Sequence, residues 1–91
     1  MLTRHARIRM QQRGIPPRVL DWLIDYGNVV YDHHGGCVRY MDHAARTRLL
    51  REEGPAALRR YHEKLNAYAV EAADGAVLTV GYRYRRLRRG H

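Results

Sequence analysis

The sequence predicts an α+β fold in which helices pack on one face of a small antiparallel sheet, in the order α-α-β-β-α-α-β-β. Apolar residues recur at helical spacing in two pairs of segments, and they alternate in two pairs of strand-like segments joined by glycine-containing turns. A length of 91 residues suits one modest core. We therefore expect a single domain over residues 1–91, with residues 85–91 as a basic C-terminal tail.

The first expected helix runs from Arg4 to Arg13. Thr3 before it is a good N-cap, because its hydroxyl can accept a hydrogen bond from a free backbone N–H of the first turn. Gly14 ends the helix. Its apolar row consists of Leu2, Ala6 and Met10.

The second expected helix begins after Ile15-Pro16-Pro17, since proline is favoured at the first helical position. We expect Gly27 to close it as the residue after the C-cap. Its apolar stripe follows the i, i+3, i+4, i+7 pattern and is widened by two flanking residues: Val19, Trp22, Leu23 and Tyr26, with Leu20 and Ile24.

The middle of the chain predicts a hairpin followed by two helices. Strands are expected over residues 28–32 and 37–41, with His33-His34-Gly35-Gly36 as the loop between them. Asp42 is an N-cap candidate for a helix to about residue 53, where Gly54-Pro55 breaks it. A further helix is expected to continue to about residue 65.

The clearest hairpin has strands over residues 68–73 and 76–84 and turns at Asp74-Gly75. Period-two alternation divides the last strand into two faces. The expected core face carries Ala76, Leu78, Val80, Tyr82 and Tyr84, and the other carries Val77, Thr79, Gly81, Arg83 and Arg85. Glycine on the second face leaves room for another backbone or a ligand.

The chain is strongly basic, with a formal net charge of +8 and sixteen Arg against one Lys. Guanidinium is a planar fork suited to bidentate phosphate contacts. Five of the cations lie between Arg83 and Arg89. A charge run is more often a solvated tail than a site, but this run extends an expected strand. We therefore expect Arg13, Arg85, Arg86, Arg88 and Arg89 to contact nucleic acid or another polyanion.

The rest of the sequence indicates the cellular compartment and excludes several kinds of cofactor site. The sequence has no stretch of the roughly 18 to 20 apolar residues that would span a bilayer, and no apolar run near Met1 typical of a signal peptide. Cys37 is the only cysteine, which agrees with a reducing compartment. We expect a cytoplasmic protein without a membrane partner. No phosphate-cradling loop, dinucleotide fingerprint or nucleophile elbow is present, and we expect no cofactor.

Two groups of side chains are candidates for chemistry. His5, Arg9 and Arg13 are spaced i, i+4 and i+8, which predicts one polar row on the first helix. A neutral imidazole there could act as a general base, although a lone surface histidine is the commoner case. His33, His34 and Cys37 could ligate a metal, but no second ligand pair is evident, so we favour a loop with incidental histidines and a packed thiol.

Tyrosines could also provide stacking platforms for nucleobases. Because the chain has no Phe, its core needs tyrosines, and we expect most of them to be structural. The candidates are Tyr40, Tyr61, Tyr68, Tyr82 and Tyr84.

Two stretches together resemble a bacterial domain-of-unknown-function family. Residues 3–16 (TRHARIRMQQRGIP) resemble its "HAxxRMxxRGI" opening, and residues 74–83 (DGAVLTVGYR) resemble its closing "DGxVxTVxxR" hairpin. With the middle segment, the resemblance covers nearly the whole chain. That family is similar to the BrnT toxins and, more distantly, to RelE-like ribonuclease toxins.

The resemblance implies a RelE/BrnT-like fold and metal-independent RNA cleavage. His5 and Arg9 match polar positions of the opening motif, and Thr79 and Arg83 match the closing strand. Many relatives have His where this sequence has Tyr82, which puts catalysis in doubt if that position supplies an acid or a base. Fold resemblance does not by itself make the chain an enzyme.

The leading hypothesis is an RNA-directed, toxin-like ribonuclease, or a catalytically weakened relative of one, with an acidic antitoxin-like partner protein. Its site would be His5 as base or acid, Arg9 and Arg83 as phosphate clamps and Thr79 as a hydrogen-bond donor. The alternative is a non-enzymatic nucleic-acid-binding or protein-interaction module that uses the same arginines. A third hypothesis is a metal-binding protein that uses His33, His34 and Cys37.

Overall fold

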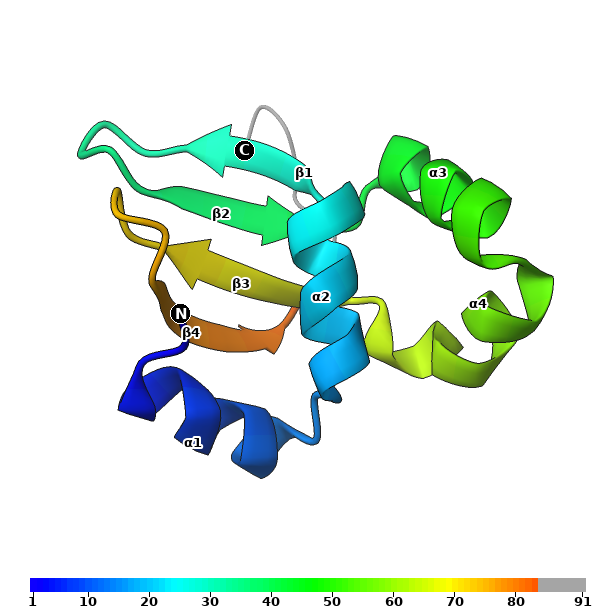
Figure 1. Cartoon of the computed structure of the whole chain (residues 1–91), viewed down its shortest axis with the longest axis horizontal. Coiled ribbons are helices and arrows are strands. Elements are labelled where there is room, and N and C mark those ends of the chain that lie inside the picture. Colours follow the sequence, from blue (N-terminus) through cyan, green and yellow to red (C-terminus); the bar gives the residue numbers. More distant parts are fainter. Residues whose placement is uncertain (84–91) are drawn as a thin grey trace.

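The computed structural model describes residues 1–83 and confirms the α+β class and the expected order of elements. Four strands form one antiparallel sheet in the order β1-β2-β3-β4. Figure 1 shows α2 crossing one face of this sheet, α1 running beside β4, and α3 and α4 lying beyond one end. The elements are α1 (Arg4–Arg13), α2 (Pro17–Tyr26), β1 (Asn28–Tyr31), β2 (Cys37–Tyr40), α3 (His43–Glu53), α4 (Pro55–Tyr61), β3 (Ala67–Glu71) and β4 (Val77–Tyr82).

Local sequence signals fix most of the helix ends. The Thr3 hydroxyl accepts a hydrogen bond from the Ala6 N–H at 3.1 Å, and the Asp42 carboxylate accepts one from the Ala45 N–H at 2.8 Å. Gly14 ends α1 in the left-handed conformation, with φ of 64°. The expected caps are therefore confirmed at these three positions.

Gly27 ends α2 for a different reason from the one expected. Its φ of −63° and ψ of 148° are extended rather than left-handed. A Cβ at this position would lie 2.4 Å from the Leu23 carbonyl oxygen. Only glycine therefore allows the backbone to pass so close to the last turn of the helix. The α4 segment also differs from expectation: the α-helix stops at Tyr61 and a 3₁₀ turn, His62–Lys64, completes the segment.

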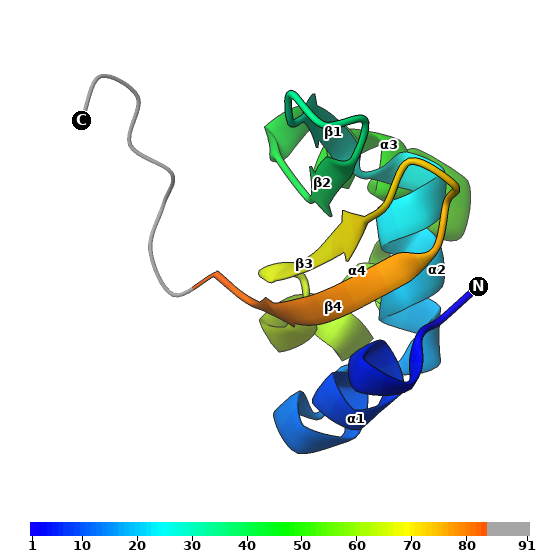
Figure 2. The same cartoon turned by 90° about the vertical axis from the view of Figure 1, so that its left-hand side faces the viewer.

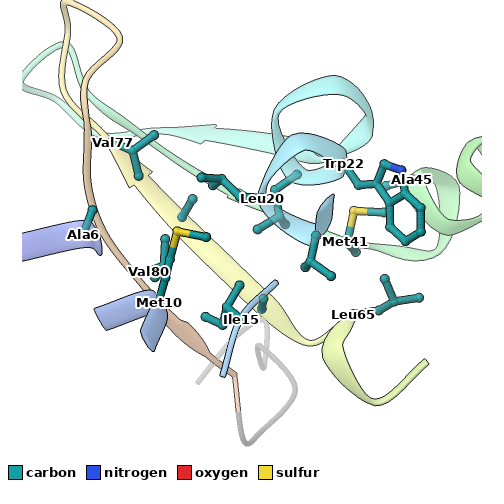
Figure 3. Close-up of a cluster of buried hydrophobic side chains, with 14 of the residues drawn as sticks. Ala6, Met10, Ile15, Leu20, Trp22, Met41, Ala45, Leu65, Val77 and Val80 are labelled. Atoms are coloured by element: carbon teal, nitrogen blue, oxygen red, sulfur yellow. The ribbon is translucent and has the colours of Figure 1, made fainter. Parts of the chain in front are cut away.

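The core lies between the sheet and α2, and α1 and α3 close its sides. Figure 3 shows these apolar side chains gathered between the strands and the helices. Val19, Leu23 and Leu49 are fully buried. Ile24, expected to widen the stripe of α2, is 38% exposed instead. The aromatic rings of Trp22 and Tyr61 meet edge to face at 5.2 Å, which ties α2 to α4.

Strand β4 departs from the expected alternation. Val70 pairs with Thr79 while Glu71 pairs with Val77, so Leu78 is the extra residue of a β-bulge. The bulge moves Val77 into the core at 2% exposure and leaves Leu78 42% exposed, which reverses the faces predicted for these two residues. Beyond the bulge, Val80 is buried as predicted. The N-terminal residues add to this edge, where Leu2 forms a parallel bridge with Val77.

The two faces of the sheet are covered unequally. Figure 2 shows α2 on one side of the strands, with α1 below it beside β4. Helix α3 packs mainly against α2 and α4, so the expected packing of helices on the sheet holds for α2 across its face and for α1 along β4. No helix within residues 1–83 covers the opposite face, which we call the open face; it carries Tyr40, Tyr68, Thr79 and Gly81.

Candidate functional site

A pocket of about 440 Å³ lies where α1 meets the open face beside β4. Helix α1 contributes the whole predicted polar row to it, because residues four apart on a helix lie on one side. Strand β4 contributes Thr79 and Gly81. The full lining is His5, Arg9, Arg13, Tyr68, Thr79, Val80, Gly81 and Tyr82.

Packing on the other sides of α1 holds this row in place. Ala6 and Met10 are buried in the core, and a different side of the helix, the one with His5, Arg9 and Arg13, lines the pocket. The Thr3 hydroxyl donates a hydrogen bond to the Leu78 carbonyl at 3.2 Å, which joins the start of α1 to the bulge of β4. The Tyr82 hydroxyl donates one to the Gly14 carbonyl at 3.2 Å, which joins the other end of α1 to the end of β4.

The charge of the pocket is one-sided. Its described lining includes two arginines and a histidine but neither Asp nor Glu. Within residues 1–83 the one ion pair joins Arg39 to Glu71, neither of which lines the pocket, so Arg9 and Arg13 have no carboxylate partner there. Lys64 adds positive charge next to the lining residue Tyr82, with its ammonium nitrogen 5.9 Å from the centre of the Tyr82 ring. Such a pocket suits an anion with several oxygen acceptors.

The structure brings His5, Arg9, Arg13 and Thr79 together but places Arg83 outside the pocket lining. Arg83 follows β4, and its guanidinium carbon lies 4.4 Å from the centre of the Tyr40 ring on the open face. Its backbone N–H donates to the Asn66 carbonyl at 2.8 Å. Arg85, Arg86, Arg88 and Arg89, the expected basic tail over residues 85–91, and Tyr84 all lie outside the described residues.

Tyr68 lines the pocket, and the sequence had named it only as one of five possible stacking tyrosines, most of them expected to be structural. The alternation of β3 gave the signal that could have placed it, because Ala67 and Ala69 fill the core face and Tyr68 must then face the other way. Tyr61, in contrast, packs on Trp22 and is structural as expected.

The His33, His34 and Cys37 group does not converge. His33 and His34 are exposed in the hairpin loop, whereas Cys37 is buried. Within the described residues no three His, Cys, Asp or Glu side chains are grouped to hold a metal ion. Burial raises the pKa of the Cys37 thiol, and its hydrogen bond to Glu71 raises it further, so the thiol is neutral and packed.

Glu71 is a buried carboxylate that sequence reasoning missed. It lies on the covered face of the sheet and is 9% exposed. It accepts hydrogen bonds from Arg39 Nε at 2.6 Å and from the Cys37 thiol at 3.3 Å. Burial acts to raise the pKa of Glu71, but these hydrogen bonds and the Arg39 charge outweigh it and leave the pKa below its ordinary value.

No protein-family model, curated protein or solved structure matches this chain. The similarity to the BrnT and RelE-like toxins therefore remains a prediction from the two motifs. In residues 1–83, no helix combines the length and the apolar character needed to cross a membrane.

Proposed function

We propose that this chain is an RNA-directed, toxin-like protein whose pocket beside β4 cleaves the RNA backbone without a metal ion. One observation carries the proposal. A histidine, two arginines without a carboxylate partner and a threonine hydroxyl, drawn from opposite ends of the described chain, line one pocket that opens to solvent. These groups can supply a base, cations for the developing phosphate charge and a hydrogen-bond donor, all of which contribute to RNA backbone cleavage.

The cleavage step removes a proton from the attacking 2′-hydroxyl and adds a proton to the departing 5′-oxygen. His5 accepts the proton of a ribose 2′-hydroxyl, and the 2′-oxygen attacks the neighbouring phosphorus. Arg9 and Arg13 stabilise the negative charge that develops on the phosphate oxygens, and Thr79 donates a hydrogen bond to one of them. The bond from phosphorus to the 5′-oxygen breaks, and the departing oxygen takes a proton from solvent water, to which His5 returns the proton that it accepted. The products are a 2′,3′-cyclic phosphate and a 5′-hydroxyl.

An RNA cleavage assay with chelator present tests this mechanism. We expect His5→Ala to slow cleavage by about 100-fold or more, the usual contribution of a positioned general base. His33→Ala is the matched control, because His33 is exposed in the β1–β2 loop and should leave the rate unchanged. Failure of the unaltered protein to cleave any RNA tried, or undiminished cleavage by His5→Ala, would overturn the mechanism.

A non-catalytic nucleic-acid-binding module is the second candidate, and Tyr82 favours it. Tyrosine stands where many members of the resembled family have His, and its hydroxyl proton is already donated to Gly14. The module predicts RNA binding without cleavage, with an affinity that falls linearly with salt on logarithmic axes. Growth arrest on expression, relieved by co-expression of an acidic partner protein, would instead support the toxin.

A further inference from the structure

A row of polar and aromatic side chains crosses the open face from one edge of the sheet to the other. In the strand register, Asn28 pairs with Tyr40, Tyr40 with Tyr68, and Tyr68 with Gly81. Residues paired in this way share one face of the sheet. The Asn28 amide donates a hydrogen bond to the Tyr40 hydroxyl at 2.9 Å, which fixes the orientation of that ring.

Tyr68 connects this row to the pocket because position 81 is glycine. A Cβ on residue 81 would lie 2.9 Å from the Tyr68 hydroxyl oxygen and 3.0 Å from two of its ring carbons. The Tyr68 ring therefore leans across β4 into space that any side chain at position 81 would occupy. From there it forms part of the lining that also contains Arg9 and Thr79.

Arg83 supplies a second planar group farther along the row. Its guanidinium stacks on Tyr40 at 4.4 Å, and its Nε is buried without a hydrogen-bond partner among the described residues. Arg46 of α3 lies close by: burial lowers the pKa of Arg46, and the charge of Arg83 lowers it further. Positive charge thus lies beside Tyr40, from Arg83 and Arg46, and in the pocket lining with Tyr68, from Arg9 and Arg13.

We propose that the aromatic part of this row, formed by Tyr68 and by Tyr40 with Arg83 on its ring, is a nucleobase-stacking subsite for single-stranded RNA. The inference rests on the proposed function, since it takes the pocket beside β4 as the phosphate site. Unpaired bases stack on tyrosine rings and on arginine planes, whereas the bases of a duplex are hidden from such a surface. The row therefore selects single strands, with the backbone held at Arg9 and Arg13 and the neighbouring bases lying on Tyr68 and Arg83.

Binding of a short 2′-O-methyl oligoadenylate tests the subsite, because this strand lacks the 2′-hydroxyl needed for cleavage. Tyr68→Leu should weaken binding about tenfold or more, within the 1–3 kcal/mol that stacking of one base contributes. Tyr68→Phe, which keeps the ring, should bind as the unaltered protein does. Arg83→Lys, which keeps the charge but not the plane, should weaken binding as well.

A strand of the same length without bases separates the subsite from the phosphate pocket. Tyr68→Leu should bind the abasic strand normally, whereas Arg9→Ala should bind both strands more weakly. Three results would overturn the subsite and leave the phosphate pocket standing. The unaltered protein could bind the two strands equally, it could bind single strand and duplex equally, or Tyr68→Leu could bind the oligoadenylate normally. No binding of either strand would overturn both proposals. Buried Trp22 reports by its fluorescence that each variant is folded.

Discussion

The covered and open faces of the same sheet are built from alternate residues of the same strands, yet they treat charge in opposite ways. On the covered face, Arg39 Nε lies 2.6 Å from a carboxylate oxygen of Glu71, and the small side chains of Ala67 and Ala69 let α2 approach closely. On the open face, Arg83 lies on an aromatic ring, and Arg9 and Arg13 have no carboxylate partner within residues 1–83.

This difference separates residues that stabilise the fold from residues available for binding. A buried charge is costly unless it is paired, so the covered face tolerates Arg39 only together with Glu71. An arginine at the edge of solvent needs no internal partner, and its guanidinium remains available for an external anion. Substitutions on the covered face should therefore change stability, and substitutions on the open face should change binding.

Leu23→Ala should produce the largest effect, on the covered side. Leu23 is fully buried in α2. Truncation leaves a cavity and should lower the free energy of unfolding by about 3 kcal/mol. Leu78→Ala is the matched control: the bulge leaves Leu78 42% exposed, so the loss should be less than about 1 kcal/mol. Denaturant unfolding measures both values, and a large loss for Leu78→Ala would contradict the bulge.

Glu71→Gln should lower the free energy of unfolding by about 1.5–3 kcal/mol at neutral pH, the next largest effect, because the charge-assisted hydrogen bond from Arg39 is lost. The pKa of Glu71 is lowered in the folded state, so its contribution is present above the ordinary pKa of 4.5 and is lost as the pH falls through the folded value. Unfolding curves of both proteins should therefore converge in acid. A difference that persists unchanged at low pH would show that the carboxylate charge is not the cause.

Gly81→Ala should have the smallest effect on stability and a clear effect on binding. The new Cβ would meet the far end of the Tyr68 side chain, which can swing aside, so we expect a cost of less than about 1 kcal/mol. The displaced ring should weaken binding of single-stranded RNA. Thermal unfolding and RNA titration of the same sample measure the two quantities. A stable variant with unchanged RNA affinity would show that the position of Tyr68 over Gly81 is unimportant.

Local chemistry made much of the fold predictable. The caps at Thr3 and Asp42, the Gly14 turn and the Asp74-Gly75 hairpin act on neighbouring backbone groups, so the sequence alone indicates them. The i, i+4 spacing of His5, Arg9 and Arg13 predicted one row for the same reason, and the pocket contains all three. The apolar stripe of α2 was also predictable, apart from the exposed Ile24.

What the sequence could not determine depends on contacts between distant segments. The bulge at Leu78 arises from pairing with β3, and it moved Val77 to the core against a regular alternation. The meeting of α1 with Thr79 and the separation of Arg83 from that pocket likewise depend on how elements pack, not on their own residues. The sequence by itself thus determined the elements and their polar faces, because those follow from local backbone geometry. Only the tertiary structure decided which face stayed open and which cations share a pocket, because register and packing are set by partners far away in the chain.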